Sequence, residues 1–293
     1  MMNLLVTLDA GYVGPLRVML ASLMAAEPEE SFTLYVAHSR MGEEDFRRIR
    51  SAVDPARCTV AEIRVSDETL SDAPIVYRYP REMYYRLFAA RFLPPELDRV
   101  LYLDPDTVVI GRLRELYELE MGESLYAAAS HVHEQFRKFN EVRLGMPENA
   151  PYVNSGVVLM NLPRLRAEQD VWEVLAYIER KKPFLLLPDQ DVMNALYGDR
   201  ILPIDPLLYN LDEKYWNLYN LNPKNRGNRR TLNWVRENTR VVHFCGRNKP
   251  WKPGYHGEFR VFYDEAARLL PPEPPAEETP QKREITEEQK KEC

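Results

Sequence analysis

Apolar positions change their spacing near the start of the chain. Residues 4–8 form a short apolar run with β-branched members, as in a buried strand. The next apolar positions recur at the spacing of one helix face, at Leu16, Met19, Leu20 and Leu23. The pattern predicts a strand, a turn and a helix in this order.

The same order returns along the first half of the chain. The spacing predicts strands over residues 32–37 and 59–65, with a helix over 43–52 between them. A helix over 81–91 and a buried strand over 100–103 follow. Alternating strands and helices favour a Rossmann-like α/β fold with a mixed, mainly parallel sheet flanked by helices. Ligands of such sheets bind at the carboxyl ends of the strands.

The second half of the chain continues this alternation and then loses it. The pattern predicts a strand over 155–162, a helix over 170–180 and a further helix that begins near Asp189. Over residues 202–233, Pro, Asn and aromatic residues are mixed, which is typical of long loops over a site. Residues 271–293 are rich in Pro, Glu and Lys and have little to bury, so we expect a disordered tail.

Composition and charge exclude several classes of function. The chain has 293 residues, of which 45% are hydrophobic, and we expect a single catalytic domain over residues 1–270. Its formal net charge of -6 gives no general reason to bind nucleic acid, because that needs a concentrated basic face. No apolar run approaches the roughly 20 residues that span a bilayer, so we expect no integral membrane segment.

The cysteines and the N-terminus bear on the compartment. Cys58, Cys245 and Cys293 are widely spaced and form no CxxC pair. This spacing indicates neither a disulfide framework nor a structural zinc site. Residues 1–10 lack the basic flank and long apolar stretch of a signal peptide. We therefore expect a cytoplasmic protein, and any association with the inner membrane would be peripheral.

An acidic pair directly follows the strand predicted over 100–103. Asp104 and Asp106 are two positions apart, so in an extended segment both carboxylates point the same way and can face one divalent cation. Pro105 suits a strand end, since it has no amide to leave unpaired. Asp-Pro-Asp is also common in turns. The spacing alone therefore leaves a metal site and a plain turn both open.

The segments around this pair resemble glycosyltransferase family 8, the retaining galactosyl- and glucosyltransferases related to glycogenin. Residues 84–94 and 99–109 are similar to the DxD region of that family. Further segments match in the same order, at residues 6–12, 152–157, 189–191 and 243–251. The resemblance covers residues 3–265 and implies a GT-A fold.

The resemblance also implies a metal ion and a nucleotide donor. The family uses a UDP-sugar and Mn²⁺ held by the two DxD acids, here Asp104 and Asp106, and by a histidine that His243 matches. A mixed N/O ligand set suits Mn²⁺ better than Mg²⁺, which stays an alternative. Gly246 and Lys249 match positions that hold the diphosphate. Without the resemblance, His243 would suit a core histidine, Gly246 a turn and Lys249 a solvated lysine.

Other matched positions surround the donor. By resemblance, Asp9 and Tyr12 face the nucleotide, with Thr7 beside them as a backbone contact. Arg86 matches an arginine that meets the donor or steadies an active-site acid, although its helix pattern also suits a surface arginine.

Asn154, Asp189 and Gln190 match the donor-sugar pocket. Gln190 would lie near the anomeric carbon, where a carboxamide is a poor nucleophile. A reaction with same-face attack then fits better, in which the departing phosphate oxygen takes the acceptor's proton. Asp191 is the alternative nucleophile, and Asp-Gln-Asp also suits a helix N-terminus.

The match has two departures. Gly11 stands where many relatives carry asparagine, so one side-chain contact to the nucleotide is missing. Ser130 and His131 stand where relatives often place an aspartate, and a histidine does not reproduce a permanently acceptor-only carboxylate. These departures leave the transferred hexose open.

The sequence therefore predicts a Mn²⁺-dependent retaining hexosyltransferase. Its donor would be UDP-glucose or UDP-galactose, and its acceptor a saccharide or glycolipid such as lipopolysaccharide. Two alternatives remain. Paired acids also serve metal-dependent nucleotidyltransferases, although no Walker-type loop is present, and the departures at Gly11 and His131 would suit a catalytically silent module that binds nucleotide sugars or glycans.

Overall fold

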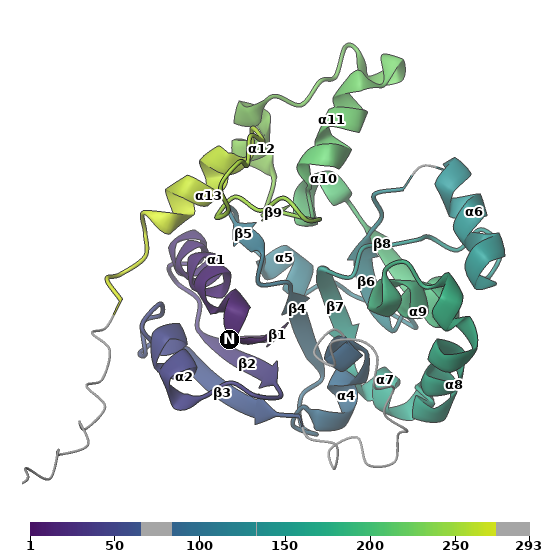
Figure 1. Cartoon of the computed structure of the whole chain (residues 1–293), viewed down its shortest axis with the longest axis horizontal. Helices are drawn as coiled ribbons and strands as arrows, with labels where there is room; N and C mark the ends of the chain where they lie inside the picture. The colour runs from purple at the N-terminus through teal and green to yellow at the C-terminus, as the bar shows by residue number, and fades with distance from the viewer. Residues whose placement is uncertain (66–83, 133, 274–293) are drawn as a thin grey trace, which may run out of the picture.

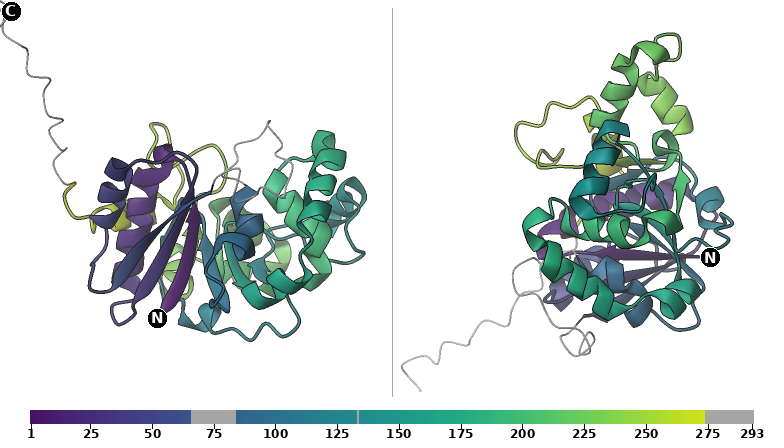
Figure 2. Two further views of the ribbon diagram at one scale, coloured as in Figure 1. Left: turned by 90° about the horizontal axis from the view of Figure 1, so that it is seen from below. Right: turned by 90° about the vertical axis from the view of Figure 1, so that its right-hand side faces the viewer.

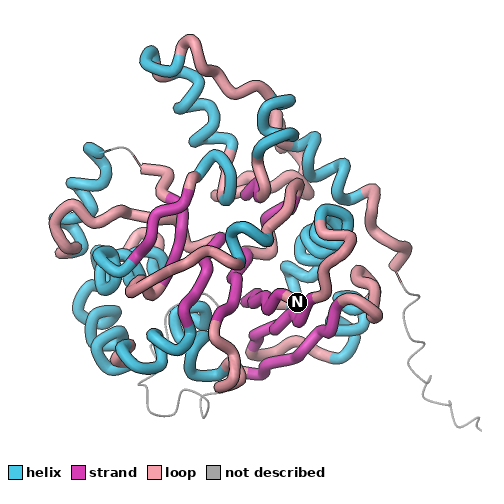
Figure 3. Tube along the Cα trace, turned by 180° about the vertical axis from the view of Figure 1, so that it is seen from behind, coloured by secondary structure: helices cyan, strands magenta, loops and turns pink. Residues whose placement is uncertain are grey.

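A seven-stranded sheet runs through the middle of the protein, with helices around it (Figure 3). The computed structural model describes residues 1–65, 84–132 and 134–273. In spatial order the strands are β3 (Cys58–Arg64), β2 (Phe32–His38), β1 (Met2–Thr7), β4 (Arg99–Leu103), β7 (Val157–Asn161), β6 (Tyr126–Ala129) and β8 (Ile201–Ile204). A second, two-stranded sheet pairs β5 (Thr107–Val109) with β9 (Val241–His243).

One strand of the large sheet runs against the others. β3, β2, β1 and β4 are parallel neighbours, and β6 is parallel to β8. β7 lies between β4 and β6 and is antiparallel to both. The mixed, mainly parallel sheet expected from the sequence is confirmed.

Helices cover both faces of the sheet, as Figures 1 and 2 show. The longer ones are α1 (Val13–Ala26), α2 (Glu43–Arg50), α6 (Glu134–Leu144), α8 (Val171–Lys181), α9 (Pro188–Tyr197), α11 (Glu213–Leu221) and α13 (Arg260–Ala267). The shorter ones are α4 (Ala89–Phe92), α5 (Arg114–Tyr117), α7 (Leu162–Glu168), α10 (Pro206–Tyr209) and α12 (Leu232–Asn238). Three 3-10 helices matter for the site: η1 (Ala10–Tyr12), η2 (Arg86–Phe88) and η3 (Lys182–Phe184).

Alternation along the strands builds a core on each face. Leu4 and Val6 of β1 pack in the cluster that includes α1 and α2. Leu5, between them, packs with α4, α7, α8 and α9 on the opposite face. Side chains of β5 and β9 pack in a third cluster with α11, α12 and α13. A strand that is buried on both sides reads as a continuous apolar run, which is why the sequence reveals β1.

The prediction of irregular loops over residues 202–233 was wrong in part. It contains most of β8, all of α10 and α11 and the start of α12. Asp205 and Asp212 cap α10 and α11, accepting from Leu207 N at 2.8 Å and Tyr215 N at 2.7 Å. These helices are too short to give a clear periodic pattern, and packing against the third core cluster holds them.

Other predicted elements agree with the structure within a few residues at their ends. Of the helix predicted over 81–91, residues 81–83 lie outside the described residues, and the remainder includes η2 and α4. Of the predicted tail, residues 274–293 lie outside them too. Within the described part of the chain, no helix is both long enough and apolar enough to cross a membrane.

Candidate active site

Two acidic side chains and one histidine meet where β4 ends. Asp104 follows β4 directly, Asp106 precedes β5, and His243 is the last residue of β9. The β5–β9 ladder pairs Thr107 with His243, so it carries the histidine to the acids. His243 Nε2 lies 3.5 Å from Asp104 Oδ2 and 3.2 Å from Asp106 Oδ1. The structure thus brings together the three side chains singled out in the sequence, which we call the Asp-Asp-His cluster.

The backbone beside this cluster leaves no room for a side chain. A Cβ atom on Gly156 would lie 2.1 Å from His243 Cε1 and 2.7 Å from Asp104 Oδ2. Asp104 N donates to Gly156 O at 2.7 Å, which holds the two segments together. A glycine is therefore required for this close approach.

Two residues that the sequence did not reveal orient the cluster. The His243 Nδ1 atom lies 2.8 Å from Asn210 Oδ1, so Nε2 is the ring nitrogen that faces the acids. Tyr102 OH donates to Asp104 Oδ1 at 2.6 Å. Such partners fix the direction of metal ligands. Tyr102 looks like an ordinary core position of a strand, and Asn210 falls in the stretch expected to be loop, so neither gave a signal.

The cluster is strongly charged. Burial alone would raise the pKa of Asp106, but the facing His243 and Lys249 hold it well below its usual range. Burial alone would lower the pKa of His243, but Cys245 and Asp106 raise it well above its usual value. Lys249 Nζ donates to Asp106 Oδ2 and, at 2.8 Å, to Phe244 O. Lys249 thus lies on the cluster itself.

Arg86 joins the cluster to the start of α9. Its Nη2 lies 2.9 Å from Asp104 Oδ1, and its Nη1 donates to Ser155 O at 2.9 Å. Its Nε lies 3.2 Å from Asp189 Oδ2, an ion-pair distance without hydrogen-bond geometry. The guanidinium carbon lies 4.3 Å from the centre of the Tyr102 ring. With a side chain only 10% exposed, Arg86 is not a surface arginine.

Asn154, Asp189 and Gln190 form one hydrogen-bonded group. Asn154 Nδ2 donates to Gln190 Oε1 at 3.1 Å, and Ser155 N donates to the same oxygen at 3.4 Å. Asp189 Oδ2 accepts from Ser155 Oγ at 3.0 Å. Burial raises the pKa of Asp189, although the charge of Arg86 opposes the shift. The amide of Gln190 is thereby held next to the segment that carries Gly156.

Asp191 faces away from this group, toward α6. Arg143 donates to both of its oxygens, at 2.8 and 2.9 Å, and Tyr152 OH donates at 2.6 Å. The backbone amides of Leu186 and Leu187 donate to Oδ2 at 2.7 and 3.1 Å. A fully buried carboxylate with this many donors has no oxygen free for nucleophilic attack.

The positions matched to the nucleotide lie around η1. Asp9 Oδ1 accepts from Gly11 N at 2.8 Å, so this exposed carboxylate caps the short helix. Thr7 ends β1, and its Oγ1 lies 3.1 Å from Tyr102 OH. Burial raises the pKa of Tyr12, against the opposing charge of Lys249. The charges of Asp106 and Asp104 also act on the Tyr12 hydroxyl, so Tyr12 lies near the Asp-Asp-His cluster.

The loop after β9 returns to η1. Gly246 has a positive φ of 88°, and nothing lies within 4 Å of where its Cβ atom would be. The backbone conformation, not crowding, therefore favours glycine there. The Trp251 ring packs edge-on against Tyr12, with 6.1 Å between the ring centres, and lies against Tyr263, with 5.6 Å between the centres. These contacts pack the loop against the domain.

Sequence comparison finds relatives over most of the chain. The model of the family described as Glycosyl transferase family 8 matches residues 3–253. Lipopolysaccharide 1,2-glucosyltransferase of Escherichia coli K12 is 29% identical over 251 residues, which cover 85% of this chain and 72% of that protein. Lipopolysaccharide 1,3-galactosyltransferase of Salmonella typhimurium is 25% identical, with 85% and 72% covered. General stress protein A of Bacillus subtilis is also 25% identical, with 89% and 91% covered.

A solved structure shares the fold. The crystal structure of the galactosyltransferase LgtC in complex with donor and acceptor sugar analogs matches with a TM-score of 0.77. The two chains are 23% identical, and the match covers 94% of this chain and 98% of that one. At this identity the likeness concerns the fold.

Proposed function

The chain belongs to glycosyltransferase family 8 and is a glycosyltransferase with a GT-A fold, and we propose that it is a retaining, Mn²⁺-dependent hexosyltransferase. Its donor is UDP-glucose or UDP-galactose, and its acceptor is a saccharide or glycolipid of the lipopolysaccharide type. The names of the bacterial relatives support this choice of sugars and acceptor. Mg²⁺ is the alternative ion.

The observation that carries the proposal is the Asp-Asp-His cluster. Its ligand atoms all lie within 4.8 Å of one another, and two carboxylate oxygens with one imidazole nitrogen are donors that Mn²⁺ accepts. Asp104, Asp106 and His243 would hold the ion, which would neutralise the charge that develops on the departing UDP. Lys249 adds a positive charge at the same place.

The remaining residues support roles around the donor. We assign Asp9, Tyr12 and Thr7 to the nucleotide and Gly246 to the diphosphate loop. Because these positions, the Asp-Asp-His cluster and the loop after β9 adjoin one another, one extended nucleotide sugar can contact them all.

Arg86, Asn154, Asp189 and Gln190 would contact or shape the sugar pocket. Asn154 and the amide of Ser155 hold the Gln190 carboxamide, and Arg86 pairs with Asp189. Two observations support these roles: the contacts that hold the four side chains together, and the matching order of their segments in the chain and in the family.

The carboxylates near the donor pocket favour same-face attack. Asp191 is enclosed by its donors, and Asp189 Oδ2 is held by Arg86 and Ser155, so neither carboxylate is arranged as the free nucleophile of a double displacement. Gln190 is an amide and a poor nucleophile. The bond from the acceptor oxygen to the anomeric carbon then forms on the face from which the phosphate oxygen leaves. The departing phosphate oxygen takes the proton of the acceptor hydroxyl.

A glycolipid acceptor requires contact with a membrane, and one surface suits it. Large apolar side chains are exposed along α6 and around η3, at Phe136, Phe139, Val142, Phe184, Leu186 and Leu187. The two segments adjoin, because Arg143 Nη1 donates to Phe184 O at 2.6 Å. Lysines and arginines accompany them at Lys138, Arg180, Lys181 and Lys182, in a chain whose net charge is -6. We call this surface the α6–η3 patch and place the enzyme in the cytoplasm, peripheral to an anionic inner membrane.

The deciding experiment measures UDP release from a panel of nucleotide sugars, with Mn²⁺ and with a chelator. Slow hydrolysis of UDP-glucose or UDP-galactose that needs Mn²⁺ is expected, with a loss of at least about 100-fold in Asp106→Asn. Asp98→Asn is the matched control, since this exposed acid precedes β4 and lies outside the cluster. Absence of both turnover and nucleotide binding would favour the silent module, and equal rates with chelator would remove the metal from the proposal.

A further inference from the structure

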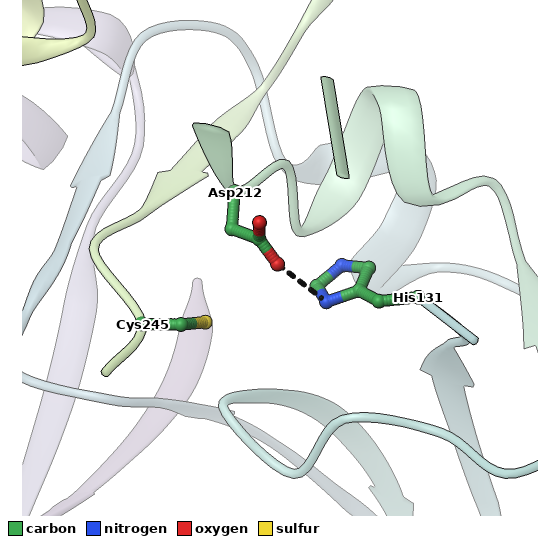
Figure 4. Close-up of side chains that lie close together, drawn as sticks. All are labelled: His131, Asp212 and Cys245. Atoms are coloured by element: carbon green, nitrogen blue, oxygen red, sulfur yellow. Dashed lines mark ion pairs between the residues drawn. The ribbon is translucent and has the colours of Figure 1, made fainter. Parts of the chain in front are cut away.

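A second group of ligating side chains lies next to the Asp-Asp-His cluster. His131 follows β6, Asp212 caps α11 and Cys245 follows β9, so three separate segments supply them. Figure 4 shows the three side chains pointing toward a common point. One ligand atom from each lies within 4.8 Å of the other two. The spacing of the cysteines in the sequence gave no indication of this group.

The contacts of His131 leave one ring nitrogen directed at a carboxylate. His131 Nε2 lies 2.5 Å from Asn210 O, and a carbonyl oxygen can only accept, so this nitrogen carries a proton. His131 Nδ1 lies 2.9 Å from Asp212 Oδ2. In the neutral ring, a lone pair and a carboxylate would face each other there. The present 2.9 Å leaves room for a proton between the two atoms, and a metal ion bound by both needs them about 3.3–3.8 Å apart.

The surroundings have the form of a metal site. A metal-bound histidine usually donates its other N–H to a carbonyl or carboxylate, as His131 Nε2 does. Asp212 Oδ1 accepts from Tyr215 N at 2.7 Å, which orients the carboxylate and leaves Oδ2 toward the centre. The sulfur of Cys245 interacts with the side chain of His243 and has a long contact, 4.0 Å, with Asn154 Nδ2.

We propose that His131, Asp212 and Cys245 form a second metal site, which takes a thiophilic divalent cation such as Zn²⁺. Zinc binds nitrogen, sulfur and oxygen at about 2.0–2.3 Å, so its tetrahedral ligands lie about 3.3–3.8 Å apart. Small side-chain rotations bring the present distances to these values. Three protein ligands leave a fourth position open to water or to a substrate oxygen.

Binding has two physical consequences. The Cys245 thiol releases its proton to solvent when the sulfur coordinates the ion. The ion also ties together the ends of β6 and β9 and the start of α11, which surround the candidate donor pocket. Zn²⁺ is therefore expected to stabilise the protein against heat and to restrict this pocket.

The cysteine is close to both ligand groups, so the test has to separate them. Cys245 also contributes to the charge around His243, which lies two positions before it. Co²⁺ reports the distinction, because a cobalt ion bound to thiolate has a near-ultraviolet charge-transfer band, whereas one bound to the Asp-Asp-His cluster alone has N and O ligands only.

The experiment titrates Co²⁺ into the metal-stripped full chain. We expect a thiolate band that Zn²⁺ abolishes, that is absent from Cys245→Ser and His131→Ala, and that persists in Asp106→Asn. Cys58→Ser, which removes the buried cysteine of β3, is the matched control and should keep the band. Circular dichroism of each variant verifies its fold.

Three results would overturn the proposal. No band in the folded wild-type chain means that a proton, not a metal, lies between His131 and Asp212. A band that survives in Cys245→Ser comes from another cysteine. Loss of the band in Asp106→Asn with retention in His131→Ala assigns the thiolate to the first cluster instead.

Discussion

At the scale of single residues, Gly156 is the most constrained position of the site. An added Cβ atom would overlap His243 Cε1 and crowd Asp104 Oδ2. We expect Gly156→Ala to displace one of the two ligands by several tenths of an ångström or more. Mn²⁺-dependent UDP release should fall about 100-fold, because misplacement on this scale disrupts catalysis. Rates of UDP release by the variant and the wild type, measured over a series of Mn²⁺ concentrations, test this prediction.

A second glycine provides the matched control. Gly14 lies in α1, and nothing lies within 4 Å of its missing Cβ atom. Gly14→Ala should stabilise the protein by about 0.4–1 kcal/mol through the unfolded chain and leave turnover unchanged. Full turnover in Gly156→Ala would mean that the Asp-Asp-His cluster does not bind the catalytic ion.

Some site residues could be predicted from the sequence, and others could not. Asp104 and Asp106 are visible because strand geometry alone puts their carboxylates on one side. His243 joins them only through pairing of β9 with β5, which no local pattern specifies. Asn210 is less visible still, since its role depends on where the chain before α11 passes the ring of His243.

At the scale of elements, α9 carries three polar residues with different surroundings. Asp189 and Gln190 face the candidate donor pocket, whereas Asp191 binds α6 through Arg143. Asp191→Asn should therefore lower the free energy of unfolding by about 2–4 kcal/mol, because the Arg143 pair is broken while its guanidinium stays largely covered. Urea unfolding measures the loss.

The same variant distinguishes a structural from a catalytic carboxylate. At a temperature where Asp191→Asn is folded, its turnover should stay within a few-fold of wild type. Asp264→Asn is the control, since its pair with Arg260 is exposed and should contribute under about 1 kcal/mol. Unchanged stability with lost turnover would return Asp191 to the list of nucleophiles.

The order of elements could be predicted more easily than their direction. β1, β2 and β3 alternate with helices and are parallel, as local spacing indicates. β7 has an equally apolar pattern, yet it runs antiparallel between β4 and β6. Apolar spacing determines which residues are buried, but the direction of a central strand depends on pairing partners far along the chain.

At the scale of the whole molecule, the α6–η3 patch predicts selective membrane binding. The protein should float with vesicles that contain anionic phospholipid and much less with neutral ones. Phe139→Ser with Leu186→Ser should weaken binding at least about tenfold, because each side chain contributes on the order of 1 kcal/mol when buried in the interface. Vesicle flotation at two salt concentrations measures this.

A matched control residue lies on a different protruding helix. Leu221 is 74% exposed at the end of α11, which extends away from the sheet (Figure 1). Leu221→Ser should bind vesicles like the wild type. Equal flotation of the double variant, or no preference for anionic lipid, would contradict a role for the patch.

The small β5–β9 ladder also determines when, during synthesis, the enzyme can first work. All seven strands of the large sheet lie before residue 205, so most of the scaffold emerges from the ribosome early. Thr107 cannot pair with His243 until β9 has been synthesised. Asp106 likewise lacks its ion pair until Lys249 has been synthesised. An unfinished chain therefore carries the acids without the residues that complete their site, and the Asp-Asp-His cluster with its lysine forms only after residues 243–249 have been made.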